Sequence, residues 1–205
     1  RGLMGYGGYY SHLDPITMRP DSRELGQNQS KKNGSQRRRG PPSASVPSPG
    51  SVRAFLELHI EQGPVLEDHG ITIGVVEAVL GIRWYDCTVT GMEAHAGPTP
   101  MGLRQDALQV ATRIMQEVVA VAMDHQPHGR GTVGMVQVHP NSRNVIPGRV
   151  KFSMDLRNVS NELLDQMDAE IRAFAAAVAE ESGLKVEIEE VSHYPAVPFE
   201  AGCVA

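Results

Sequence analysis

The chain lacks several features that mark whole classes of protein. Its 205 residues include two cysteines, Cys87 and Cys203, which are too few for a disulfide framework or a structural zinc knot. It has no run of about 18 apolar residues that would cross a membrane. Its first residues also lack the charged-then-apolar pattern of a secretion signal. We therefore expect a cytoplasmic protein with reduced thiols and no membrane partner.

Aromatic residues are also scarce, at 5%, but the hydrophobic content of 40% and the charged content of 21% are those of an ordinary globular chain. The charges are unevenly distributed. Residues 1–53 hold nine Lys/Arg and three Asp/Glu, a net charge of +6, whereas residues 54–205 hold ten and twenty-one, a net charge of −11; the two sum to −5. An acidic folded portion argues against a nucleic-acid partner.

The first quarter of the sequence offers little to bury. Residues 26–51 consist almost entirely of Ser, Gly, Gln, Pro and basic residues, which cannot offset the entropy of ordering them. The basic run at residues 31–39 is typical either of a solvated linker or of an electrostatic tether. We predict that residues 1–51 are poorly ordered and that the folded portion follows them.

Apolar periodicity predicts six elements in the folded portion. Alternating apolar and β-branched residues indicate strands, and apolar residues spaced by three or four indicate helices. Ser160 and Gly183 are typical N-cap and C-terminal stop residues. The order β-α-β-β-α-β predicts an α+β fold of the ferredoxin-like kind, with both helices on one face of an antiparallel sheet. In chain order the expected elements are a strand at 84–91, a helix at 103–123, strands at 132–139 and 149–156, a helix at 160–182 and a strand at 184–191.

Four polar clusters are candidates for chemistry, and each has a structural alternative. In LELHIEQGP, which also contains Gln62, His59 is either a metal ligand or a hydrogen-bonded structural histidine. In SHLD, His12 and Asp14 have the His-x-Asp spacing of a metal ligand and its partner. A pattern this short also arises by chance.

The other two clusters point to anion binding. In GMEAHAGPTPMGLRQDA, His95 lies between a strand and a helix N-terminus, where backbone N–H groups suit an anion. The alternative is a capping loop with an incidental histidine. NVIPG and DLR place Asn144 and Arg157 thirteen residues apart. Arginine binds carboxylates bidentately, and an asparagine amide both donates and accepts. The structural alternatives are that Arg157 pairs with Asp155 or caps the following helix.

Three of these motifs, in their order and spacing, resemble one family. ELHIEQGPVLE, then GMEAHAGPTPM with RQDA, then NVIPG with DLR are similar to the amidase/hydantoinase/carbamoylase group of dinuclear-metal amidohydrolases. This group includes N-carbamoyl-L-amino-acid hydrolases, β-ureidopropionases and allantoate amidohydrolases, and lies within the zinc aminoacylase/carboxypeptidase superfamily. The resemblance covers residues 52–199. A peptidase of the same superfamily is a third reading, which HIEQG and the Asn/Arg pair disfavour.

The resemblance implies a division of the chain into parts. Residues 1–51 contain at most a remnant of a catalytic domain. Residues 52–80 correspond to a remnant of the α/β catalytic domain with a hinge. Residues 81–192 correspond to a lid and dimerisation domain, which implies a homodimer, and residues 193–205 to the hinge that returns to the catalytic domain.

The resemblance also implies a role for each motif residue. His59 corresponds to a ligand of one of two divalent metals (zinc, or manganese or cobalt), and Gln62 to a residue near the substrate. His95 corresponds to a histidine that enters the neighbouring subunit's active site and stabilises the tetrahedral oxyanion. Asn144 and Arg157 correspond to the pair that holds the substrate's carboxylate. The implied substrate is a small N-carbamoyl amino acid or ureido compound, whose linear C–N bond is hydrolysed.

Most metal ligands of such an enzyme are not recognisable in the sequence. His59, with His12 and Asp14 as further candidates, falls short of the roughly five protein ligands that a dinuclear centre needs. We therefore expect a truncated chain without a competent dinuclear centre. Two hypotheses stay open: a metal-dependent amidohydrolase of the carbamoylase type, and a non-catalytic dimerisation module derived from such an enzyme. Bound metal and turnover of N-carbamoyl amino acids discriminate between them.

Overall fold

The computed structural model describes residues 54–204, which fall into two compact units, residues 54–62 and residues 63–204. The first unit has no helix or strand among its described residues. The elements of the second unit, in chain order, are α1 (Val65–Asp68), β1 (Ala78–Val79), β2 (Gly81–Thr90), β3 (Ala94–His95), η1 (Met101–Leu103), α2 (Ala107–Asp124), β4 (Arg130–Thr132), β5 (Val136–His139), β6 (Val145–Ile146), β7 (Arg149–Asn158), α3 (Asn161–Ser182), β8 (Lys185–Tyr194), β9 (Val197–Pro198) and α4 (Ala201–Val204).

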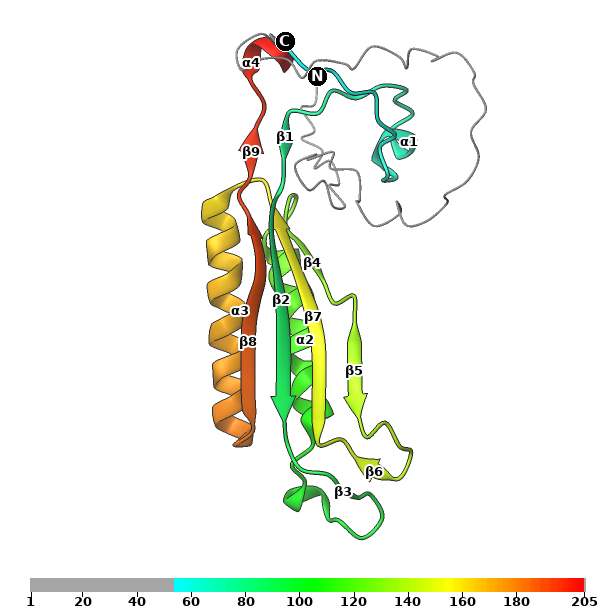
Figure 1. Cartoon of the computed structure of the whole chain (residues 1–205), viewed down its shortest axis with the longest axis vertical. Coiled ribbons are helices and arrows are strands. Elements are labelled where there is room, and N and C mark those ends of the chain that lie inside the picture. The colour runs from blue at the N-terminus through cyan, green and yellow to red at the C-terminus, as the bar shows by residue number, and fades with distance from the viewer. Residues whose placement is uncertain (1–53, 205) are drawn as a thin grey trace, which may run out of the picture. The chain divides into compact units, whose positions relative to one another are not determined.

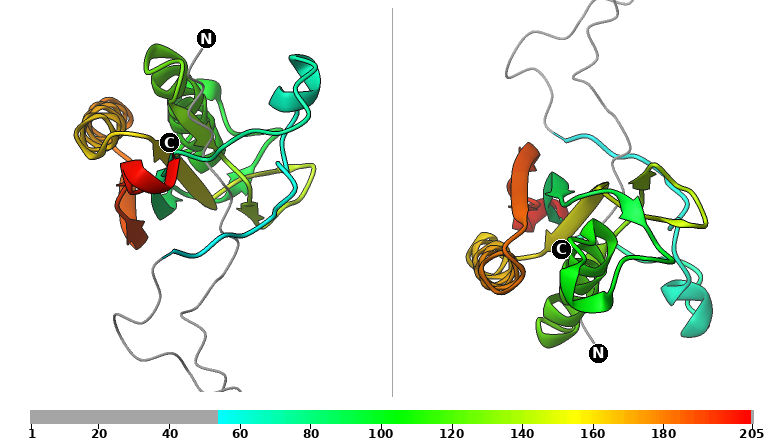
Figure 2. Two further views of the ribbon diagram at one scale, coloured as in Figure 1. Left: turned by 90° about the horizontal axis from the view of Figure 1, so that it is seen from above. Right: turned by 90° about the horizontal axis from the view of Figure 1, so that it is seen from below.

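An antiparallel sheet is the centre of the second unit. Its strand order is β4-β7-β2-β8. Strand β5 also pairs with β7, at residues 149–152, whereas β4 pairs with β7 at residues 155–157. The central strands β2 and β7 pair over their full length, from Gly81 opposite Asn158 to Thr90 opposite Arg149. Helices α2 and α3 cover the same face of the sheet and leave the other face open (Figures 1 and 2). The chain is thus a mixed α/β fold in which the six predicted elements are present.

The hydrophobic core lies between the sheet and the two helices. Alternate residues of β2 and β7 face the helices, because successive side chains of a strand point to opposite faces. On α3, Ala175 is buried, whereas the neighbouring Phe174 is only partly buried against the core. The buried residues from the sheet and from α3 are Tyr85, Cys87, Val89, Val150, Phe152, Met154, Leu156, Leu164, Met167, Ile171, Ala175 and Val178.

The predicted helix boundaries are right for α3 and four residues early for α2. Ser160 caps α3, since its Oγ accepts a hydrogen bond from the backbone N–H of Leu163 at 3.2 Å, and Gly183 ends it with a φ of 69°. The periodicity predicts that α2 starts at residue 103, but residues 101–103 form a separate 3₁₀ turn. Asp106 begins α2 instead, because its carboxylate accepts from two N–H groups of the first turn.

The strand predicted at 132–139 is two strands in the structure. Thr132 pairs with Asp155 and Val136 with Phe152, so three residues of this segment lie opposite two residues of β7. This is the arrangement of a β-bulge, in which one strand carries an extra residue. Ser153 of β7 holds the bulged segment against its strand, since the backbone N–H of Ser153 donates to the carbonyl of Met135 at 3.0 Å. In the part of the chain that the structure describes, no helix is both long and apolar enough for a membrane span.

Candidate functional site

Two of the predicted site residues, His95 and Asn144, lie together at one end of the sheet. The short strand β3 pairs with β6, which places His95 opposite Val145. The backbone N–H of Ala96 donates to the carbonyl of Asn144 at 2.9 Å. Both side chains are exposed. We call the segments 91–106 and 140–148 the tip of the domain.

Hydrogen bonds within the tip hold His95 in a defined orientation. The backbone N–H of Gly97 donates to His95 Nδ1 at 3.0 Å. Because Nδ1 accepts this bond, a neutral His95 carries its proton on Nε2, from which it donates outward. Arg104 closes the loop behind it, donating from Nη2 to the carbonyl of Ala96 at 2.8 Å and from Nε to that of Thr99 at 3.1 Å.

Two glycines allow the two segments of the tip to pack closely against each other. A Cβ at Gly91 would lie 2.1 Å from the carbonyl oxygen of Gln105, and a Cβ at Gly148 would lie 2.6 Å from Glu93 Cγ. The backbone N–H of Gly91 donates to the carbonyl of Gly148 at 2.8 Å. This close approach excludes any larger residue at either position and ties the two segments of the tip together.

Arg157 lies at the opposite end of β7 from the tip. It lies eight positions after Arg149, the first residue of β7, which corresponds to about 26 Å of extended strand. Within one chain, Asn144 and Arg157 are therefore too far apart to hold one carboxylate together. Their joint role at one carboxylate stays a prediction, and it needs two chains, because the twelve residues between them include most of β7 and do not fold back.

The side chain of Arg157 is held by Asp155, as the structural alternative for this residue predicts. Both side chains lie on the open face of the sheet. Nε of Arg157 donates to Asp155 Oδ1 at 2.9 Å, and Nη2 donates to Oδ2 at 2.7 Å. The Arg157 side chain is 15% exposed and that of Asp155 27% exposed. This half-buried pair fixes the plane of the guanidinium.

The predicted residues of the first motif lie in the other unit. Residues 54–62 form no strand, and His59 is exposed with its Nδ1 beside the carbonyl of Ile60. Gln62 has a left-handed backbone conformation, with a φ of 56°. A lone extended segment cannot pair its own backbone groups, which explains why the motif forms no strand by itself. His12 and Asp14 lie outside the described residues.

The family model of the peptidase dimerisation domain matches residues 78–183. The chain belongs to the peptidase dimerisation domain family. This match covers β2, β4, β5 and β7 of the central sheet together with α2 and α3, and ends before the fourth main strand, β8. It confirms the dimerisation domain that the motifs predict.

The dimerisation domain has carbamoylases among its relatives. The chain is 44% identical over 149 residues to an N-carbamoyl-L-amino-acid amidohydrolase of Rhizobium meliloti, covering 73% of this chain and 36% of the relative. It is 35% identical to an allantoate amidohydrolase of Escherichia coli, covering 80% and 40%. A crystal structure of a hydantoinase/carbamoylase family amidase from Burkholderia multivorans matches with a TM-score of 0.70 and 53% identity, covering 71% and 36%. The chain thus spans about a third of the length of these relatives, and the predicted family is confirmed.

The donor set of a dinuclear metal centre does not come together in residues 54–204. No three His, Cys, Asp or Glu side chains within that range are placed to hold one metal ion. His59 is bound to its own neighbouring carbonyl and is surrounded by exposed apolar residues, which are not metal donors. The described residues of this chain therefore do not form a binding site for the two metals that the family of its relatives implies.

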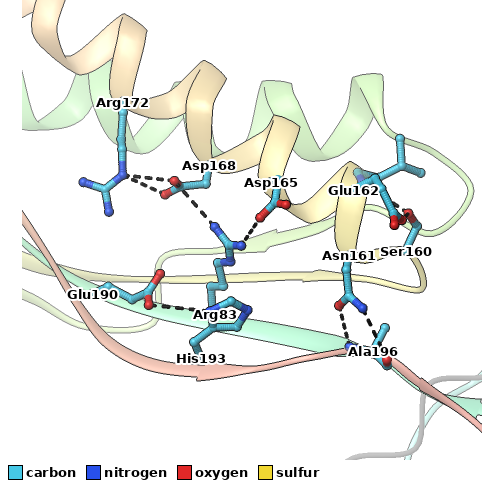
Figure 3. A network of polar contacts seen from close by, with 11 residues as sticks. Arg83, Ser160, Asn161, Glu162, Asp165, Asp168, Arg172, Glu190, His193 and Ala196 are labelled. Atoms are coloured by element: carbon cyan, nitrogen blue, oxygen red, sulfur yellow. Dashed lines mark hydrogen bonds and ion pairs between the residues drawn. The ribbon is translucent and has the colours of Figure 1, made fainter.

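Sequence reasoning missed a charged network between the sheet and α3 (Figure 3). Arg83, with a side chain 11% exposed, forms ion pairs with Asp165 and, at 3.6 Å, with Asp168. Arg172 donates to Asp168 at 2.9 Å, and its guanidinium lies 5.4 Å from the ring centre of Tyr85. The network fastens α3 to β2 in the dimerisation domain. The sequence signal for this network is Arg83 itself, because it takes a position on the buried face of β2 where the other residues are apolar or aromatic.

Proposed function

We propose that the chain is the substrate-covering and dimer-forming part of a cytoplasmic, metal-dependent amidohydrolase that cleaves the linear ureido C–N bond of N-carbamoyl amino acids or allantoate. The observation that carries the proposal is the tip, where His95 is presented by a loop whose hydrogen bonds select its tautomer. The 44% identity to an N-carbamoyl-L-amino-acid amidohydrolase supports the substrate class.

His95 is the hydrogen-bond donor in this proposal. Hydrolysis of an amide passes through a tetrahedral oxyanion, and a preorganised donor aimed at that oxygen lowers the barrier. With Nδ1 occupied by the N–H of Gly97, the Nε2–H of His95 is the group that meets the oxyanion. The exposed position of the side chain suits donation to a site outside its own domain.

Asn144 and Arg157 have separate places in this proposal. Asn144 shares the tip with His95, so it acts in the same site as His95. Arg157 lies at the other end of β7, where β2 and β8 meet the hinge strands β1 and β9, and so acts in a different copy of the site. In a homodimer, each substrate then meets His95 and Asn144 from one chain and the carboxylate-binding Arg157 from the other. Gln62 as a residue near the substrate, and His59, His12 and Asp14 as candidate metal ligands, stay predictions from the sequence.

We also assign the domain to the ferredoxin-like class. The support is the strand order, with the fourth main strand β8 beside the first, β2, and the second, β4 and β5, beside the third, β7. Two helices on one face and an open opposite face complete this arrangement. Such a domain presents its open face and its edge strand to partners.

Metal content and turnover, measured on one preparation of the 205-residue chain, test the proposal. Metal is determined by elemental analysis, and hydrolysis of N-carbamoyl-β-alanine, N-carbamoyl-L-amino acids and allantoate is followed by release of ammonia. Turnover that a chelator abolishes and a divalent metal restores supports the amidohydrolase. His95→Gln is then expected to lower kcat about 100-fold, the scale of one lost oxyanion donor, with little change in KM.

A non-catalytic dimerisation module is the second candidate, favoured by the absence of a metal donor set in residues 54–204. A dimer that binds no metal and turns over none of these compounds would establish this candidate and overturn the enzyme. Ser160→Ala is the matched control for His95→Gln, because it alters a helix cap remote from the tip. Equal activity of wild type and His95→Gln would remove His95 from the proposed site.

A further inference from the structure

One peptide unit of the tip joins the ring of His95 to the side chain of Arg104. The backbone N–H of Gly97 donates to His95 Nδ1 at 3.0 Å. Nη2 of Arg104 donates to the carbonyl of Ala96 at 2.8 Å. That carbonyl and that N–H belong to the same peptide bond, which is trans. Because a trans peptide unit is planar, its oxygen and its N–H point in opposite directions, so Arg104 holds one side of the unit while His95 accepts from the other.

A second hydrogen bond fixes the direction of the guanidinium. Nε of Arg104 donates to the carbonyl of Thr99 at 3.1 Å, so the half-buried side chain bridges two carbonyls of the same loop. Thr99 in turn donates from Oγ1 to the carbonyl of His95 at 2.7 Å. Within residues 54–204, Arg104 takes part in no ion pair, and its positive charge therefore acts on the two carbonyls.

The charge of Arg104 strengthens the hydrogen bond to His95. A cation at the oxygen of a peptide unit polarises the unit and makes its N–H a better donor, as in any chain of consecutive hydrogen bonds. A neutral imidazole carries its proton on one nitrogen and accepts at the other. A strong donor facing Nδ1 therefore keeps Nδ1 unprotonated and leaves the proton of His95 on Nε2.

Gly97 makes this arrangement easy to reverse. A half-turn of the peptide unit would exchange its N–H for its oxygen, and an oxygen facing Nδ1 would favour a proton there instead. Such a rotation changes φ at residue 97, and glycine accepts either sign of φ at little cost. A Cβ at Gly97 would lie 3.2 Å from His95 Cε1, so the close approach of the ring favours glycine at this position. The restraint on the peptide unit must therefore come from another residue, and Arg104 holds its oxygen on the side away from the ring.

We propose that Arg104 is a positioning residue for His95, which selects the Nε2–H tautomer through the peptide unit between Ala96 and Gly97. Arg104 acts through His95 alone. The inference rests on the proposed function, because a fixed Nε2–H serves the reaction only where His95 is the donor to the oxyanion. The tautomer itself is a property of the chain without substrate and is measured without turnover.

The ring nitrogens of His95 report the tautomer directly. ¹⁵N NMR spectra of the full-length chain at pH 8, where an exposed histidine is neutral, distinguish the protonated ring nitrogen from the unprotonated one, and His95→Gln assigns the signals. Wild type is expected to carry the proton on Nε2. Arg104→Gln is expected to raise the ratio of the Nδ1–H to the Nε2–H tautomer about tenfold, the effect of losing one charge-assisted hydrogen bond. Arg104→Lys is expected to restore part of the wild-type ratio, since an ammonium keeps the charge but cannot bridge both carbonyls as a guanidinium does.

Two control variants separate this role from a general effect on the tip. Arg143 lies in the tip and is exposed, and among the residues that the structure describes it has no side-chain hydrogen bond or ion pair. Arg143→Gln removes a charge from the tip and is expected to leave the tautomer unchanged. Thr99→Val removes the Oγ1 bond within the same loop but keeps the carbonyl of Ala96 bonded to Arg104, and the same result is expected. Thermal melts check that each variant is folded.

Turnover provides a second readout. In the hydrolysis of N-carbamoyl-L-amino acids or allantoate, Arg104→Gln is expected to lower kcat about tenfold with little change in KM. The same substitution is expected to cause no further loss in a chain that already carries His95→Gln, because the effects of coupled residues are not additive. An equal loss in both backgrounds would give Arg104 a role of its own and overturn its action through His95.

The two readouts distinguish a failure of this inference from a failure of the proposed function. If none of the compounds is turned over but the tautomer changes in Arg104→Gln and in neither control, the proposed function falls while the selection of the tautomer by Arg104 stands. If wild type is active but Arg104→Gln keeps the wild-type tautomer, or if either control variant changes it equally, the inference is overturned and the proposed function stands. A change in Arg104→Gln that Arg104→Lys partly reverses, with both controls unchanged, supports the inference.

Discussion

Two ionisable groups on the buried face of β2 resist losing their protons. Burial raises the pKa of the Cys87 thiol from 9.0 to about 12. Burial also raises the pKa of the Tyr85 hydroxyl well above its ordinary value of 10.0. In the unfolded chain both groups ionise at their ordinary values, so the native state alone keeps them protonated at moderately alkaline pH.

Stability is therefore expected to fall as the pH rises above about 9. Between pH 9 and pH 10 the unfolded state releases the Cys87 proton while the folded state retains it, which lowers the free energy of unfolding by about 1 kcal/mol. Above pH 10, Tyr85 adds to the loss. Urea unfolding at pH 8, 9 and 10 measures the slope. Cys87→Ala is expected to flatten it between pH 9 and 10, and an unchanged slope in this variant would contradict the assignment.

The proposed site residues differ in whether a local sequence motif reveals them. His95, Asn144 and Arg157 stand in short motifs whose order and spacing identify a family, so their positions were predictable. Arg130 of β4, the register partner of Arg157, stands in no motif. Its place opposite Arg157 depends on the register of β4 against β7, which joins residues 27 apart in the chain. Long-range register of this kind leaves no local pattern, and the same holds for Arg83 and its partners on α3.

At the scale of elements, the start of α2 depends on one side chain. Asp106 Oδ1 accepts from the backbone N–H of Leu108 at 3.0 Å and of Gln109 at 3.4 Å, groups that have no partner within the helix. Asp106→Ala is expected to lower the free energy of unfolding by about 1 kcal/mol, and Asp106→Asn to leave it nearly unchanged, because asparagine caps equally well. Urea midpoints at constant slope measure both.

Asp124 offers the matched control for this prediction. It ends α2, where a carboxylate faces the negative end of the helix and caps nothing. Asp124→Ala is expected to preserve stability or to raise it slightly. Equal losses of stability in Asp106→Ala and Asp124→Ala would mean that the removal of a negative charge, and not the loss of the helix cap, accounts for the effect.

Elements with strong periodicity were predictable, and short ones were not. The central strands β2 and β7 and both long helices bury alternating or helically spaced side chains, which is a local signal in the sequence. The bulge between β4 and β5 depends on Ser153 of another strand. The two-residue strands β1, β3, β6 and β9 each depend on pairing with a strand that is distant in the sequence. They are too short to show a periodicity that would predict them.

At the scale of the whole molecule, the proposed site residues lie at two ends of the domain. His95 and Asn144 lie at one end of the sheet, and Arg157 lies near the other end, about 26 Å of extended strand from Arg149 at the start of β7. One copy of the domain cannot bring these groups to the same substrate. A site that uses all three therefore predicts an assembly in which the tip of one chain reaches the hinge end of another.

Assembly is expected to appear as a concentration-dependent thermal stability. A homodimer unfolds to two separate chains, so each tenfold rise in protein concentration favours the folded state by mass action. For a chain of this size we expect Tm to rise by about 2 °C per tenfold increase. Calorimetry over a hundredfold range of concentration, with light scattering at the same concentrations, measures both quantities. A constant Tm together with the mass of a single 22.2 kDa chain would contradict the dimer and, with it, the shared site, since His95 and Arg157 would then have no partner chain through which to meet.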